Sequence, residues 1–112
     1  MGVPPAVPWE AVGPRRLERL DWIELDGCPR AYVATTARSR LLGLAWLDDL
    51  PDGAGLLIPG CSSVHTFGMR FALNVGFLDG DLRVLRRVEA VPPGRVLWRR
   101  GAAAVLERKA RG

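Results

Sequence analysis

The alternation of hydrophobic and polar positions along the chain predicts mostly short β-strands joined by tight turns. Residues 17–36 alternate imperfectly around Asp26-Gly27, a dipeptide typical of hairpin turns, and predict a first β-hairpin. Residues 55–58 form an apolar run that stops at Pro59-Gly60, which predicts a buried strand.

A second hairpin is predicted where residues 73–78 and 82–88 flank the turn Asp79-Gly80-Asp81. Residues 95–98 and 102–106 are apolar enough for two further short strands. Strands at such regular spacing, separated by turn residues, are typical of all-β sandwiches and barrels.

One short helix interrupts this pattern. Thr36 is a suitable N-cap for residues 37–47, where Leu44 and Trp46 would belong to an apolar side. Gly43 within that segment is best explained by a close approach to the sheet or by a turn.

The predicted fold class is therefore mainly β, a small sandwich, jelly-roll-like or barrel-like domain of six or seven short strands. The short helix would lie between strands two and three. Residues 1–14 contain four prolines and predict a poorly ordered lead-in, which leaves residues 15–112 as a single globular β domain.

Composition and charge narrow the compartment and the partners. We expect a cytoplasmic protein, because the chain has no apolar run long enough to span a bilayer and no signal-peptide pattern. Cys28 and Cys61 are accordingly expected to be reduced. Residues 83–112 carry nine basic against two acidic side chains, a balance of +7, whereas the chain as a whole is +4.

That basic segment raises the hypothesis of a module that binds nucleic acid through residues 83–111. Two observations weaken it. Arg83 and Arg87 alternate with apolar residues as on a solvated sheet face, and Trp98 is the only aromatic residue after Phe77, whereas nucleic-acid platforms interleave aromatics.

Enzymatic chemistry is a second alternative. His65, the only histidine, could act as acid or base in a hydrolase-type reaction with Cys61 or Asp79. In an extended segment, however, Cys61 and His65 would lie about 13 Å apart. An acid pair around Gly80 is more typical of a turn. The sequence has no ligand pattern for zinc, so no metal or cofactor is predicted.

The favoured hypothesis is a non-catalytic binding or interaction module with a small polar pocket for a sugar-like or anionic ligand. A donor, an acceptor, a cation and a soft apolar contact occur within ten positions, as expected of a polar pocket with apolar walls. The predicted ligand-binding residues are His65, Thr66, Met69, Arg70 and Asn74.

Five motifs in a fixed order resemble the bacterial and archaeal family known as domain of unknown function 192. They are Arg40-Leu41-Leu42-Gly43-Leu44, Gly55-Leu56-Leu57-Ile58, Val64-His65-Thr66-Phe67-Gly68-Met69-Arg70, Leu73-Asn74-Val75-Gly76-Phe77-Leu78-Asp79 and Val105-Leu106-Glu107. The resemblance implies a compact, mainly β fold with one short helix and no established activity. Asn74 and Ala72 depart from it, since aspartate and proline are usual there. Asn74 keeps the shape of aspartate but loses its charge and its proton-transfer capacity.

Overall fold

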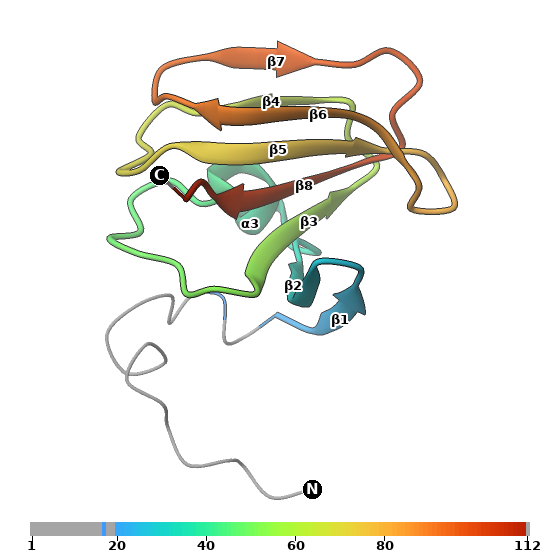
Figure 1. Cartoon of the computed structure of the whole chain (residues 1–112), viewed down its shortest axis with the longest axis horizontal. Coiled ribbons are helices and arrows are strands. Elements are labelled where there is room, and N and C mark those ends of the chain that lie inside the picture. Colours follow the sequence, from blue (N-terminus) through green and yellow to red (C-terminus); the bar gives the residue numbers. More distant parts are fainter. Residues whose placement is uncertain (1–16, 18–19, 112) are drawn as a thin grey trace, which may run out of the picture.

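The computed structural model describes residue 17 and residues 20–111 (Figure 1). The predicted lead-in over residues 1–14 lies outside the described residues. The described part of the chain is mainly β, with eight strands in two sheets. The strands are β1 (Trp22–Leu25), β2 (Cys28–Val33), β3 (Ala54–Pro59), β4 (Ser63–His65), β5 (Leu73–Leu78), β6 (Val84–Val91), β7 (Val96–Trp98) and β8 (Ala104–Lys109).

The larger sheet contains six strands in the order β1-β2-β3-β8-β5-β6, and β4 pairs with β7 in a separate two-stranded sheet. The six-stranded sheet is open, with β1 and β6 at its two edges, so the barrel alternative is wrong. The predicted count of six or seven strands is also too low. The missing strand is β4, which is three residues long and too short to show a period of its own.

Both predicted hairpins are present. The first is shorter than residues 17–36, because β1 begins only at Trp22. Its turn contains Gly27, which has a positive φ of 75°. In the second hairpin, β5 pairs with β6 across the Asp79 turn. The carboxylate of Asp79 accepts the backbone N–H groups of Asp81 (2.8 Å) and Arg83 (2.9 Å), which stabilises that turn.

The helical segment is much shorter than the predicted residues 37–47. Only α3 (Ala37–Leu42) is helical, and its Thr36 cap and Ser39 form a capping box. Gly43 then ends the helix with φ 55° and lies so close to β8 that a Cβ atom there would be 2.7 Å from Glu107 Oε1. Trp46, placed on the apolar side by the sequence, is 62% exposed instead.

The segment containing α3 joins β2 to β3, and these two strands are parallel. Local turn signals do not reveal such a pairing, because parallel strands need a long crossover connection. The result is a mixed sheet whose central strand, β8, comes from the C-terminal end of the chain (Figure 1).

The two faces of the large sheet differ in what covers them. Side chains alternate along each strand, so Val75 and Phe77 of β5 and Val105 of β8 enter the main core. That core also takes up Leu44 and Leu50 from the α3–β3 connection. Val64 of β4 joins it as well, so the small sheet packs on the same face. The opposite face carries the candidate site.

Candidate functional site

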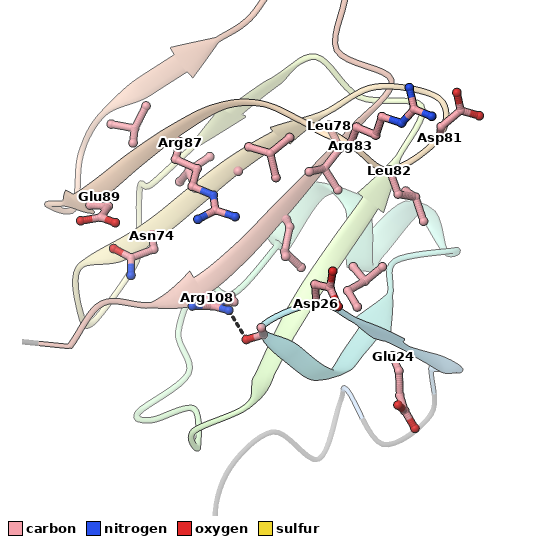
Figure 2. Close-up of a pocket in the computed structure, with 17 residues that line it drawn as sticks. Glu24, Asp26, Asn74, Leu78, Asp81, Leu82, Arg83, Arg87, Glu89 and Arg108 are labelled. Carbon is pink, nitrogen blue, oxygen red and sulfur yellow. Dashed lines mark hydrogen bonds between the residues drawn. The ribbon is translucent and has the colours of Figure 1, made fainter.

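The opposite face of the large sheet contains a groove of about 700 Å³. Its floor is formed by β5, β6 and β8, and its walls by the β1–β2 hairpin and the β5–β6 turn (Figure 2). This volume lies within the range of about 300–1,000 Å³ that is typical of small-molecule sites.

The strand register sets the order of side chains along the floor. Asn74 on β5 is opposite Arg108 on β8, and one step further Gly76 is opposite Leu106. On its other side Gly76 pairs with Arg87 of β6. Asn74, Arg87 and Arg108 therefore lie together at one end of the groove, as Figure 2 shows. Gly76 leaves open floor between them.

Four leucines gather at the other end of the groove. Leu78 of β5, Leu106 of β8 and Leu25 of β1 line it, together with Leu82 of the β5–β6 turn. Leu82 has a positive φ of 64° and is 39% exposed, so an apolar side chain is held at the groove rim in a backbone conformation unusual for leucine. One end of the groove thus carries two arginines, Asn74 and Glu89. The other end carries the leucines together with acidic side chains such as Asp26 and Asp81 (Figure 2).

Asn74 is anchored by its own side chain. Its Oδ1 atom accepts the backbone N–H of Ala90 at 2.9 Å, at the place where the β5–β6 register shifts between Leu73 and Val75. The amide nitrogen lies on the side of Arg108 (Figure 2). An aspartate at this position would keep the Ala90 contact but would offer the groove only acceptor oxygens and a negative charge.

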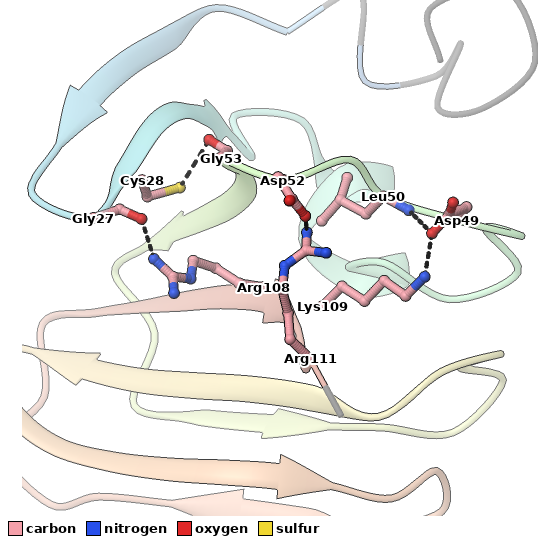
Figure 3. Close-up of polar contacts among 9 residues, drawn as sticks. All are labelled: Gly27, Cys28, Asp49, Leu50, Asp52, Gly53, Arg108, Lys109 and Arg111. Atoms are coloured by element: carbon pink, nitrogen blue, oxygen red, sulfur yellow. Dashed lines mark hydrogen bonds and ion pairs between the residues drawn. The ribbon is translucent and has the colours of Figure 1, made fainter. Parts of the chain in front are cut away.

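Arg108 is held by the wall of the groove. Its Nη1 atom donates to the carbonyl oxygen of Gly27 in the β1–β2 turn (Figure 3). Beside it, the buried Cys28 thiol donates to the Gly53 carbonyl at 3.7 Å. Burial raises the pKa of the Cys28 thiol, and the nearby Arg108 charge only partly offsets that rise. Cys28 is therefore a protonated structural residue behind the wall, as its small apolar character suggests.

The structure separates the five residues predicted to bind a ligand. Asn74 lines the groove, and the other four are absent from its lining. Thr66 is fully buried, and its hydroxyl donates to the Pro92 carbonyl (2.8 Å) and accepts the Arg95 N–H (2.7 Å). Met69 is 6% exposed and belongs to the main core.

The remaining two predicted residues lie outside the core. Arg70 is exposed and forms an ion pair with Asp48. His65 ends β4, its ring stacks on Phe67 with centroids 5.7 Å apart, and its Nδ1 accepts the Phe67 N–H at 3.2 Å.

The proposed partners of His65 in catalysis are engaged in their own loops. The Cys61 thiol donates to the Ser63 carbonyl at 2.7 Å, and Asp79 stabilises its turn as described above. Both cysteines are free, as predicted. Within residues 20–111 and Leu17, no cluster of three or more His, Cys, Asp or Glu side chains is placed to hold a metal ion. In the same described part, no helix is long and apolar enough to cross a membrane.

Sequence reasoning missed Arg87, Gly76 and Arg108 as components of the groove. The alternation of Arg87 with apolar neighbours pointed to a sheet face, but it could not indicate that this face is concave. Arg108 lies beyond the predicted strand over residues 102–106, whereas β8 continues to Lys109 and pairs with the strand that carries Asn74.

The fold and the groove together define a small mixed-sheet β domain with one concave sheet face. The chain belongs to the family DUF192, described as "Uncharacterized ACR, COG1430", whose model matches residues 24–111. This result agrees with the resemblance of the five motifs.

Two crystal structures are similar to this chain. One is a protein of unknown function from Novosphingobium aromaticivorans DSM 12444, with a TM-score of 0.65 and 24% identity over 72% of this chain and 63% of that one. The other, from Sinorhizobium meliloti 1021, is described as a "putative transcription regulator", with a TM-score of 0.66 and 20% identity over 72% of this chain and 68% of that one. The chain therefore covers less than two thirds of the Novosphingobium protein, and at these identities the likeness shows the fold alone. No curated protein matches the chain.

Proposed function

We propose that this domain binds a small organic anion, with the acid group at the Asn74 end of the groove and an apolar body along its leucines. The observation that carries the proposal is the grouping of Asn74, Arg87 and Arg108 at one end of a groove whose other end contains four leucines. The domain would act as a binding module with no catalytic step of its own.

The donors at the polar end suit a carboxylate. Guanidinium groups form strong charge-assisted hydrogen bonds with planar oxyanions. The contact with Gly27 orients Arg108 before any ligand arrives, which lowers the entropy cost of binding. The amide nitrogen of Asn74 adds a neutral donor where aspartate would repel the anion.

The charges around the groove favour a single negative charge on the ligand. Three arginines face four acidic residues in the lining, which are Glu24, Asp26, Asp81 and Glu89. The three arginines could not neutralise a ligand with several phosphates, and the four carboxylates would repel its remaining negative charge. A monocarboxylate with a hydrophobic body uses both ends of the groove and brings only one negative charge near these acids.

Calorimetric titration with a series of alkyl and aryl carboxylates tests the proposal, with the matching primary amides as uncharged controls. We expect binding that requires the carboxylate and strengthens as the apolar body lengthens, because each buried methylene contributes about 0.8 kcal/mol.

The sharpest variant is Asn74→Asp, because it is isosteric and keeps an oxygen for the Ala90 N–H. We expect it to fold normally and to weaken carboxylate binding about tenfold or more, given the strength of hydrogen bonds to charged groups. Arg87→Gln should do the same. Arg86→Gln is the matched control, because Arg86 is exposed on the same strand but absent from the groove lining. Equal affinity of Asn74→Asp and the parent protein, or equal binding of acids and amides, would overturn the proposal.

No specific observation favours the hydrolase alternative, and the ligand role of His65, Thr66, Met69 and Arg70 stays a prediction. We also propose a cytoplasmic location. It is supported by the two unbridged thiols, which fit a reducing compartment.

A further inference from the structure

The two-stranded sheet has an outward face that is aromatic and apolar. In this sheet Ser63 pairs with Trp98, and His65 pairs with Val96. Trp98 is 69% exposed and Val96 is 52% exposed. The alternate residues of the two strands, Val64 and Leu97, pack in the main core. The small sheet therefore has one anchored face and one face that presents side chains to solvent.

The rings on this face form a row. His65 lies diagonally across from Trp98, at a separation of about 7 Å, which long and aromatic side chains can bridge. Phe67 continues the row, because its ring stacks on that of His65 with an angle of 23° between the planes. Phe67 is itself 55% exposed. The row Trp98–His65–Phe67 is referred to below as the aromatic row.

The two sequence segments that form the small sheet carry charge of a single sign. Between residues 53 and 69, which contain β4 and its flanks, the sequence has no acidic residue, lysine or arginine. Between residues 90 and 106, which contain β7, the only charged residues are Arg95, Arg99 and Arg100. These arginines flank β7 on both sides, so positive charge lies at both ends of the strand that carries Trp98.

The backbone on both sides of β7 is held in place by the β4 segment. The Arg95 N–H donates to the Thr66 hydroxyl at 2.7 Å, and the Thr66 N–H donates to the Arg95 carbonyl at 2.8 Å. Arg99 donates its N–H to the Ser62 carbonyl at 2.9 Å. The arginines and the rings are thus carried on a fixed support. Such preorganisation lowers the ordering cost of binding.

We propose that the outward face of the β4–β7 sheet binds single-stranded nucleic acid, with bases stacked on the aromatic row and phosphates near Arg95, Arg99 and Arg100. Single strands are bound on platforms that combine aromatic side chains with basic residues along the backbone path. The sequence alone weakened the hypothesis of nucleic-acid binding, because Trp98 is the only aromatic residue among the C-terminal arginines. The β4–β7 pairing removes that objection by bringing His65 and Phe67 beside it. This proposal is independent of the groove, which lies on the other face of the large sheet.

Fluorescence anisotropy with labelled 12-residue oligo-dT and oligo-U tests this proposal at low salt. We expect binding whose affinity falls with added salt, with a slope of roughly −2 in a log–log plot if three phosphates are neutralised. Trp98→Ala and Phe67→Ala should each weaken binding by about fivefold or more, the usual effect of removing one stacking ring. Trp22→Ala is the matched control, since Trp22 is 47% exposed on β1, at the far edge of the large sheet.

Charge and stacking are separated by two further comparisons. Arg99→Gln should lower the salt slope by roughly one phosphate equivalent, while Arg111→Gln, which removes the same charge from the C-terminal end of the chain, should change it little. A duplex of equal length should bind more weakly than the single strand. The proposal is overturned by absence of binding at low salt, by equal losses in Trp98→Ala and Trp22→Ala, or by equal affinity for duplex, single strand and polyglutamate.

Discussion

Two glycines on the strands that flank β8 in the large sheet allow a paired test of how closely the sheet is packed. Gly55 of β3 is buried, and a Cβ atom there would lie 2.9 Å from both the Cys28 Sγ atom and the Glu107 carbonyl oxygen. It would also lie 3.0 Å from the Arg108 side chain. At Gly76 of β5, the nearest atoms would be 3.9–4.0 Å away, which is ordinary van der Waals contact.

The same substitution should therefore change stability in opposite directions at the two sites. Replacing glycine with alanine gains about 0.4–1 kcal/mol where the backbone conformation allows it, because the unfolded chain loses freedom. Gly76→Ala should show that gain. At Gly55 the added methyl group meets a backbone oxygen that cannot move without shifting β8, and overpacking of this kind costs about 1–3 kcal/mol. Gly55→Ala should thus be destabilised by about 1–2 kcal/mol.

Urea unfolding followed by circular dichroism measures both changes. The free energies of unfolding of the two variants should differ by about 2 kcal/mol. In thermal unfolding this corresponds to about 8–16 °C in midpoint temperature for a domain of this size. Adding Cys28→Ala to Gly55→Ala should recover part of the loss, since it removes one of the close contacts. The reasoning fails if Gly55→Ala is as stable as the parent protein, or if Gly76→Ala is destabilised to the same extent.

Two further predictions concern titrating side chains. Cys61 should react with iodoacetamide in the native protein faster than Cys28, because burial raises the Cys28 pKa and keeps its thiol protonated; faster labelling of Cys28 would contradict this account. The pKa of Asp49 is lowered, first by its hydrogen bond with Lys109 and then by the Leu50 N–H (Figure 3). A lowered folded-state pKa adds stability that is present above the ordinary aspartate pKa of about 4 and is lost as the pH falls through the folded-state value. Asp49→Asn should therefore make the midpoint temperature less sensitive to pH below about 4, and an unchanged acid profile would show that the exposed ion pair contributes nothing measurable.

Local turn chemistry explains what the sequence could predict of this fold. Asp26-Gly27 and Asp79-Gly80-Asp81 specify their hairpins from neighbouring residues alone, and both hairpins are present. The position of β8 between β3 and β5 depends on pairings with residues about 30–50 positions away in the chain, and no local pattern encodes them. The same limit applied to the helix, where Gly43 was correctly linked to a close approach, but the early end of α3 was not foreseen.

Of the side chains that line the groove, the sequence had pointed only to one on β5. Asn74 was one of the five predicted ligand-binding residues and lies in the groove lining, but its role in binding stays a prediction. Its partners Arg87 and Arg108 come from the two strands beside β5, so only the register could identify them. Thr66 and Met69 have the residue types of a binding site, but both are buried. Their composition alone could not distinguish a site from a structural support.

Strand β5 separates the two proposed binding surfaces. Leu73, Val75 and Phe77 face the core beneath the β4–β7 sheet, while the alternate residues Asn74 and Gly76 face the groove. A substitution on the groove side of β5 thus leaves the support of the aromatic row unchanged, whereas one on the core side would disturb both surfaces at once. The groove variants therefore change Asn74 and Arg87, whereas the nucleic-acid variants change exposed rings and arginines. If either surface lacks a ligand, the result for the other surface still holds, because no buried side chain is shared by the two sets of substitutions.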